Sequence, residues 1–235
     1  MESLYVKGHA EKTGFSISVP RASYITHAFT NFVKNIDISK PIEFNYKETN
    51  SMRAIKNILQ EGYTLGIIRY QRAFEAYFDA LMKEKGITGE QLGEFSYLAL
   101  MSDRHPLAGK PNITYNDLTN YIEITHGDPF VPYLPMTDVK KAEQSDKIDK
   151  RIFVYERGSQ FDLLSEVCST FMWVSPIPEA ILKRNHLVQR SCAEADRKYV
   201  DVLIHKKAHK FSTTEKAFIK ELERVKNETF SRVKE

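Results

Sequence analysis

The feature that most constrains the fold is the alternation of short strand-like segments with longer helix-like segments along 235 residues. Phe15–Val19 alternates apolar and polar side chains, as a strand with one buried face does. The residues that follow it repeat apolar side chains at helical spacing from Ile25 to Val33. Because strands that alternate with helices favour parallel βαβ units, the sequence predicts an α/β fold.

The same reasoning extends this alternation to the end of the chain. The pattern predicts strands at Phe15–Val19, Ile42–Lys47, Thr64–Arg69, Glu94–Met101, Tyr121–Thr125, Ile152–Tyr155, Phe171–Val174 and Lys198–His205. It predicts helices that begin near Ser23 and Ser51, and further helices at Phe74–Lys85, Tyr115–Asn120, Pro132–Ala142, Ser159–Ser169, Pro178–Arg184 and Thr213–Val233.

Composition narrows the class of protein. The net charge of +3 comes from 34 basic and 31 acidic residues, a balance that argues against a strong nucleic-acid binder. No apolar run approaches the roughly 18 residues of a membrane span, and residues 1–14 lack the apolar centre of a signal peptide. The two cysteines, Cys168 and Cys192, fit a reducing compartment better than a disulfide scaffold. A cytoplasmic protein is therefore expected.

One segment carries a more specific signal. A short apolar run from Phe95 ends near Met101 or Ser102, and the sequence His105-Pro106-Leu107-Ala108 follows. Pro106 lacks a backbone donor and restricts the residue before it, so the chain turns there. A strand followed by His-Pro-Leu-Ala resembles the effector-binding domain of LysR-type transcriptional regulators.

Other segments carry the same resemblance over Phe15 to about Val233. They are Phe15–Tyr24 (first strand and ligand-facing loop), Glu48–Ser51 (second strand–helix junction), Gly62–Ile68 (Gly-x-Leu-Asp-Leu-Gly-Ile pattern) and Val167–Pro178 (Val-x-x-Gly-x-Gly-Ile-x-x-x-Pro segment). Two departures are evident. Thr64 or Leu65 stands near the family's aspartate, and Thr170–Trp173 replaces its glycine pair, so the identity of the effector is not inherited.

The resemblance implies an architecture. Two Rossmann-like α/β subdomains would be joined by two crossover strands, near Glu94–Leu98 and Tyr199–Leu203, as in type II periplasmic binding proteins. Residues 15–93 plus 199–235 would form subdomain I, residues 94–198 subdomain II, and residues 1–14 a linker remnant. The family's N-terminal winged helix-turn-helix is absent from this chain, through truncation or, alternatively, by nature. Truncation is the preferred reading.

Three polar strand–helix junctions are candidate binding sites: Arg21–Ser23, Thr49–Ser51 and Thr125–Gly127. Ligands of open α/β sheets bind beyond the carboxyl ends of the strands, where helix N-terminal amides favour anions. The alternative is that Ser23 and Ser51 only cap helices. Arg69 could meet a carboxylate, although a solvated strand-end charge is the commoner case.

The resemblance adds Ser102, which would face the cleft, and Trp173, which would form its wall; the alternative for Trp173 is a place in the hydrophobic core. His105 would hold the turn before Pro106. The predicted ligand-binding residues are thus Arg21, Ser23, Thr49, Asn50, Ser102, Thr125, His126 and Trp173.

No catalytic or metal residues are predicted. His205 and His209 are four apart, but Lys206, Lys207 and Lys210 crowd them and disfavour a divalent ion. Nucleophile-elbow, phosphate-loop and dinucleotide motifs are missing from the sequence, so neither an enzyme nor a cofactor is expected.

The resemblance implies a ligand-sensing regulatory domain that binds a small polar or anionic effector. It would act as a homodimer or higher homo-oligomer and would reach DNA only through the missing head, with no membrane contact. The alternative is a free-standing type II solute-binding protein that serves a transporter.

Overall fold

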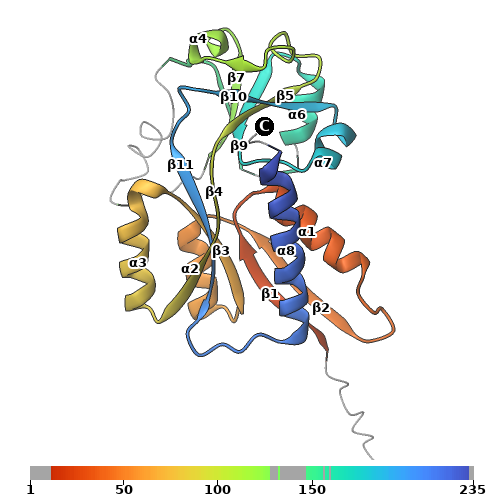
Figure 1. Ribbon diagram of the computed structural model, residues 1–235, viewed down its shortest axis with the longest axis vertical. Helices are drawn as coiled ribbons and strands as arrows, with labels where there is room; N and C mark the ends of the chain where they lie inside the picture. The colour runs from red at the N-terminus through yellow and green to blue at the C-terminus, as the bar shows by residue number, and fades with distance from the viewer. Residues whose placement is uncertain (1–11, 128–131, 133–146, 156, 159, 233–235) are drawn as a thin grey trace, which may run out of the picture.

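The computed structural model describes residues 12–127, 132, 147–155, 157–158 and 160–232 (Figure 1). Over these residues the chain forms two mixed β-sheets, each packed between helices, and it passes from one sheet to the other and back. The predicted α/β class is confirmed. The helix expected at Pro132–Ala142 falls outside the described residues, apart from Pro132.

The first sheet has the strand order β2-β1-β3-β11-β4. β1 runs parallel to β2 and β3, whereas β11 runs antiparallel to β3 and β4. Its elements are β1 (Thr13–Val19), α1 (Ser23–Lys34), β2 (Ile42–Glu48), α2 (Ser51–Gln60), β3 (Leu65–Gln71), a 3-10 turn (Arg72–Phe74), α3 (Glu75–Glu84), β4 (Ile87–Ser96), β11 (Lys198–Lys206) and α8 (Thr213–Ser231).

The second sheet has the strand order β6-β10-β5-β9-β7-β8. β7, β8 and β9 are mutually parallel, and β5 runs antiparallel to β9 and β10. Its elements are β5 (Leu98–Ser102), β6 (Asn112–Ile113), α4 (Tyr115–Leu118), β7 (Ile122–His126), β8 (Arg151–Val154), α6 (Gln160–Glu166), β9 (Thr170–Val174), α7 (Glu179–Arg184) and β10 (Leu187–Cys192).

Each sheet buries both faces. Phe15 of β1 packs against Phe32 of α1 and Phe218 of α8, so α1 and α8 cover one face of the first sheet. α2 and α3 cover the other face, where Phe78 stacks on Tyr70 with ring centroids 4.4 Å apart. The second sheet has two analogous clusters, one with α4 and one with α6 and α7. The apolar stripes seen in the sequence are therefore the core faces of these helices.

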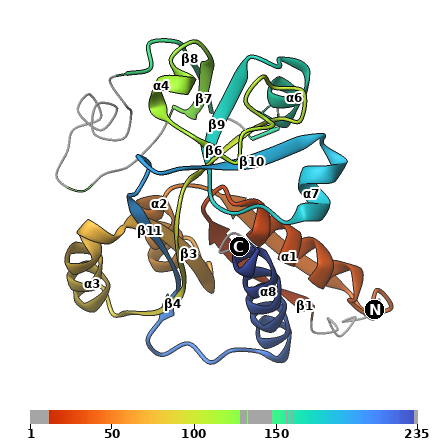
Figure 2. The ribbon, with the colours of Figure 1, turned by 45° about the horizontal axis from the view of Figure 1, so that its top comes forward.

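Two adjacent connections join the sheets. Tyr97 alone separates β4 from β5, and residues 193–197 lie between β10 and β11. β4 and β11 run side by side as an antiparallel pair, visible in Figures 1 and 2. The single strand predicted at Glu94–Met101 is thus two strands in different sheets, because the chain leaves one ladder before it enters the next.

β10 and the two-residue strand β6 were not predicted, and the first part of β4 was missed as well. β4 begins at Ile87 because it pairs with the buried strand β11 along its whole length, even though residues 87–93 are rich in glycine and polar side chains. β10 pairs with β5 and β6, and its middle residues are polar and half-buried. In both cases tertiary pairing overrides a weak local pattern.

A buried ion pair links β3 to β11. Asp201 is fully buried, and both its carboxylate oxygens accept hydrogen bonds from Arg69, at 2.7 Å from Nε and 2.6 Å from Nη2. The Tyr24 hydroxyl of α1 donates to the same carboxylate at 2.6 Å. Arg69 is therefore a buried partner of Asp201, and the interpretation of Arg69 as a solvated strand-end charge is wrong.

Burial and the ion pair shift the pKa values of this cluster. Burial, followed by the negative charge of Asp201, raises the pKa of Tyr24 well above its usual value. Burial alone would lower the pKa of Arg69, but attraction to Asp201 and their hydrogen bonds raise it instead. Arg69 therefore stays a cation and Tyr24 stays a neutral hydroxyl donor at neutral pH.

Asp201→Asn should lower the free energy of unfolding by about 3–5 kcal/mol, because it leaves the buried Arg69 charge uncompensated. Glu43→Gln, which breaks an exposed pair with Lys12, should change it by less than about 1 kcal/mol. Urea denaturation at pH 7 measures both. Equal effects of the two substitutions would contradict the role given to Asp201.

No helix in the described part of the chain is long and apolar enough to cross a membrane. Cys168 and Cys192 are both free thiols.

Candidate functional site

A cavity of about 60 Å³ lies between the two sheets. The first sheet contributes Arg21, Ser23 and Arg69, and Tyr97 joins from the connection between the sheets. The second sheet and its loops contribute His126, Arg157, Gln160, Met172, Trp173, Val174, Ser175 and Ile177. Of the predicted ligand-binding residues, Arg21, Ser23, His126 and Trp173 therefore meet in one place.

Ser23 opens α1 but does not cap it. Ala22 holds the N-cap position and makes no side-chain capping bond. The Ser23 side chain, whose residue is 4% exposed, accepts a hydrogen bond from Arg157 Nη2 at 2.7 Å. The alternative that Ser23 only caps a helix is thus wrong, because its hydroxyl faces the second sheet.

Arg157 is the residue that sequence reasoning missed. It lies between β8 and α6, yet its Nη1 donates to Thr26 Oγ1 of α1 at 2.7 Å and to Glu48 at the end of β2. Its guanidinium also lies over the Phe161 ring, 5.8 Å from the centroid. The sequence held one indication of its position. Arg157 comes shortly after β8, and the predicted junction at Gly127 comes directly after β7. Because these strands are parallel neighbours, both segments leave the sheet at the same edge.

Arg21 makes a second contact between the sheets, because its Nη2 donates to the Tyr155 carbonyl oxygen at 3.0 Å. Together with Arg69 and Arg157, Arg21 brings a third guanidinium to the cavity. Among the described residues that line the cavity there is no aspartate or glutamate. The lining therefore favours an anion, which guanidinium groups bind through paired N–H donors.

Gln160 adds an acceptor. The residue is 4% exposed, and its side-chain oxygen has no hydrogen-bond partner among the described residues. A buried acceptor without a donor is unfavourable by about 1–3 kcal/mol, so a ligand hydroxyl or amino group at this oxygen is stabilising.

The remaining wall is apolar. Trp173 and the 3%-exposed Met172, which are consecutive residues of β9, both line the cavity. Trp173 is held edge-on against Tyr115 and Phe171, with ring centroids 5.6 and 5.9 Å away. Gln189 fixes the loop after β9, because its side chain accepts from the Ile177 amide at 3.0 Å and donates to the Ser175 carbonyl at 3.2 Å.

Three other predicted residues do not line the cavity. Asn50 is the N-cap of α2 and accepts from the Arg53 amide at 3.0 Å, so its side chain is used locally. Thr49 follows Glu48 and donates its amide to the Val19 carbonyl. Thr125 precedes His126 in β7. Ser51 is buried and exchanges hydrogen bonds with the backbone of Arg69.

Ser102 lies at the wrong end of its strand. β5 runs antiparallel to β9, with Leu98 opposite the cavity-lining Val174 and Met101 opposite Phe171. Ser102 is therefore about 13 Å along the strand from the cavity end. It is fully buried, and its hydroxyl accepts from the Arg104 amide. Ser102 is not among the residues that line the cavity, and its expected place at the cleft came from the resemblance alone.

His105 holds the turn, as expected. Its Nδ1 accepts from the Leu107 amide at 3.0 Å, its own amide donates to the Ser102 carbonyl, and its ring packs on Tyr121. Burial of this 3%-exposed residue lowers the pKa of His105 from 6.5 to about 4.

The folded state holds His105 neutral, while the unfolded chain binds a proton at pH values below 6.5. Stability linked to His105 should therefore be lost as the pH falls from about 6.5 toward 4. Between pH 7.5 and 5, the free energy of unfolding of His105→Asn should fall by about 1–2 kcal/mol less than that of the wild type. Urea titrations at both pH values measure this difference, and identical pH dependence would contradict it.

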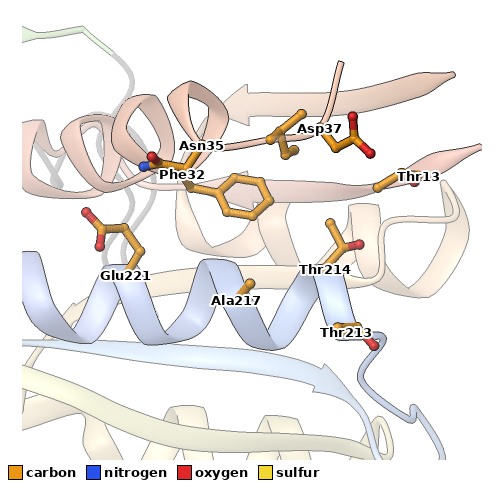
Figure 3. Close-up of a pocket in the computed structure, with 9 residues that line it drawn as sticks. Thr13, Phe32, Asn35, Asp37, Thr213, Thr214, Ala217 and Glu221 are labelled. Atoms are coloured by element: carbon orange, nitrogen blue, oxygen red, sulfur yellow. The ribbon is translucent and has the colours of Figure 1, made fainter. Parts of the chain in front are cut away.

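A second, larger cavity of about 360 Å³ lies between the end of α1 and the start of α8. Its lining is Thr13, Phe32, Asn35, Ile36, Asp37, Thr213, Thr214, Ala217 and Glu221. Figure 3 shows the Phe32 ring in the middle of this group, with Asp37 and Glu221 toward opposite ends. All of these residues belong to the first lobe, which consists of the first sheet and its helices, and the charged side chains among them are acidic. The cavity between the sheets is therefore the better candidate for an anion.

Several solved structures are similar to this chain in fold. The effector-binding domain of QuiR in complex with shikimate is similar to this chain, with 19% sequence identity, a TM-score of 0.56, and 93% of this chain and 99% of that chain covered. The regulatory domain of CcmR from Synechocystis PCC6803 in complex with 2-PG has 15% identity, a TM-score of 0.60 and coverage of 91% and 97%.

The chain has the fold of LysR regulatory domains. This confirms the predicted architecture of two sheets of the type II periplasmic-binding-protein kind. The regulatory domain of the LysR-family regulator MetR from N. meningitidis agrees, with 15% identity, a TM-score of 0.56 and coverage of 92% and 94%. No protein-family model matches the sequence, and no curated protein does.

Proposed function

We propose that this chain is the ligand-sensing regulatory domain of a LysR-type regulator and binds a small anionic effector between its two subdomains. Residues 15–93 with 199–235 would form one subdomain and residues 94–198 the other. One observation carries the proposal: arginines from both sides, Arg21 and Arg69 from one and Arg157 from the other, line a single cavity. A ligand held from both sides would fix the angle between the subdomains.

The lining also specifies the chemistry of the effector. Arginine pairs with planar oxyanions, carboxylates above all, through two parallel hydrogen bonds. The open acceptor of Gln160 favours a second group that donates, such as a hydroxyl. Trp173 and Met172 offer contact to a short apolar body. A small hydroxylated or aminated acid fits all three requirements, and the complexes of QuiR with shikimate and CcmR with 2-PG support a small-molecule effector.

Binding without catalysis is the function that this lining supports. The response would pass to DNA through a DNA-binding unit, so the protein would work in the cytoplasm. A solute-binding protein for a transporter is the alternative with the same architecture. It is less well supported because the structural neighbours reported above are effector-binding and regulatory domains.

A panel of small carboxylic and phosphoric acids, including shikimate and inorganic phosphate, should contain compounds that raise the melting temperature of the chain. Calorimetric titration of such a compound should show affinity weakened by about 0.5–1.5 kcal/mol in Ser23→Ala. Arg21→Gln should weaken it further, because a hydrogen bond to a charged group is stronger. Arg224→Gln, on the outer face of α8, is the matched control and should bind as the wild type does. Unchanged affinity in both cavity variants would place the ligand elsewhere.

We also propose a homodimer. Exposed apolar side chains occur in two places that a helix-to-strand pairing would cover. Val33, Ile38 and Ile42 lie around the end of α1 and the start of β2, and Phe153 and Tyr155 lie at the edge strand β8 and just after it. A two-fold interface would bring one patch of each protomer onto the other patch of its partner.

Light scattering at high micromolar concentration should show a dimer for the wild type. Ile38→Glu and Phe153→Glu should each shift it toward monomer, because both patches are used twice in a two-fold interface. Lys56→Glu, elsewhere on the same lobe, controls for added negative charge. A monomeric wild type would contradict the proposal.

A further inference from the structure

The interaction between Arg157 and Glu48 differs from the ion pairs Arg69–Asp201 and Arg151–Glu123. Arg69–Asp201 joins neighbouring strands of the first sheet, and Arg151–Glu123 joins neighbouring strands of the second. Arg157–Glu48 instead crosses the cleft, from the loop after β8 to the end of β2. It therefore holds two bodies together rather than one sheet.

The pair also limits the space in the cleft. Arg157 contacts Ser23, Thr26 and Glu48 of the first lobe, and the cavity beside it measures about 60 Å³. Pockets that enclose small organic ligands are roughly 300–1,000 Å³. An effector of ordinary size thus requires Arg157 and its partners to move apart.

The chemistry of the contact is that of ligand recognition. The Glu48 carboxylate accepts a hydrogen bond from the Arg157 guanidinium, and Arg157 also lines the cavity. The hydroxyls of Ser23 and Thr26 accept the other hydrogen bonds of this guanidinium. The side chains of Arg157 and Glu48 keep 15% and 20% of their surface exposed. This partial exposure gives an external anion access to the guanidinium, where it can compete with Glu48.

We propose that the Glu48 carboxylate occupies the place of the effector's anionic group: it keeps the cleft closed through Arg157 and is displaced when the effector binds. This inference rests on the proposed function, since it names the step by which that cleft accepts its ligand. Arg157 then changes partner from an internal carboxylate to an external one. The effector must overcome this competition, so its affinity is lower than the open cleft would give.

Two substitutions break the pair from opposite sides and have opposite consequences for binding. Glu48→Gln removes the competing charge and keeps the anion receptor, whereas Arg157→Met removes the receptor itself. Glu43→Gln is the matched control, because Glu43 lies on the same strand and its side chain is 57% exposed. Trp173 is the single tryptophan of the chain and lines the cavity, so its fluorescence reports on the cleft without a label.

Without ligand, acrylamide quenching of Trp173 should increase about twofold in Glu48→Gln and in Arg157→Met, because the cleft opens. Glu43→Gln should match the wild type. Wild-type quenching in both cleft variants, with their melting temperatures showing a folded protein, would overturn the inference whether or not any ligand is known.

With inorganic phosphate and shikimate as probes at constant ionic strength, Glu48→Gln should bind about fivefold or more tightly than the wild type, and Arg157→Met should bind more weakly. Equal or weaker binding by Glu48→Gln would overturn the displacement step. Increased quenching in the variants, combined with no binding of any acid in the panel, would contradict the proposed function while supporting the role of the Arg157–Glu48 pair in closing the cleft.

Discussion

The ion pair between Arg69 and Asp201 is the interaction on which the geometry of the cleft depends. It ties β3 to β11, receives the Tyr24 hydroxyl from α1, and places the rest of the Arg69 guanidinium in the cavity wall. The β11–β4 register shifts at Asp201, and Arg69 also lies over Phe95, 4.7 Å from the ring centroid. A β-bulge changes the direction in which nearby side chains point. The register shift next to Asp201 therefore accompanies the burial of its carboxylate against Arg69, close to the connections between the two sheets.

The electrostatic contacts within each sheet differ from those between the two sheets in how deeply their carboxylates are buried. Within each sheet, charges are paired where the carboxylate is nearly or fully buried, as in Arg69–Asp201 and Arg151–Glu123. Between the sheets, the contacts of Arg21, Arg157 and Arg232 involve a carbonyl or partly exposed carboxylates. Buried pairs are strongly destabilising to break, whereas exposed ones contribute little. The lobes therefore keep their shape while the contact between them is easily remade.

Much of this organisation is predictable from the sequence, and the failures have a common cause. The alternation of elements, the helix at α1 and the His105 turn depend on neighbours in sequence. Asp201 pairs with Arg69, 132 residues away, and Glu48 pairs with Arg157, 109 residues away. No local sequence pattern indicates such pairs. The position of Ser102 depends on strand direction, and the start of β4 depends on pairing with β11. Periodicity encodes which face of a segment is buried, but not what it is buried against.

The two connections between the lobes are unequal, and this restricts how the lobes move. One is the single residue Tyr97, and the other spans residues 193–197. Tyr97 stacks on Tyr199 with centroids 4.0 Å apart, directly above the hydrogen-bonded β4–β11 ladder. Because β4 and β11 both belong to the first sheet, a rotation of one lobe relative to the other bends or twists only these two short backbone segments. A small angular change at these adjacent segments would become a larger displacement at the outer ends of both lobes.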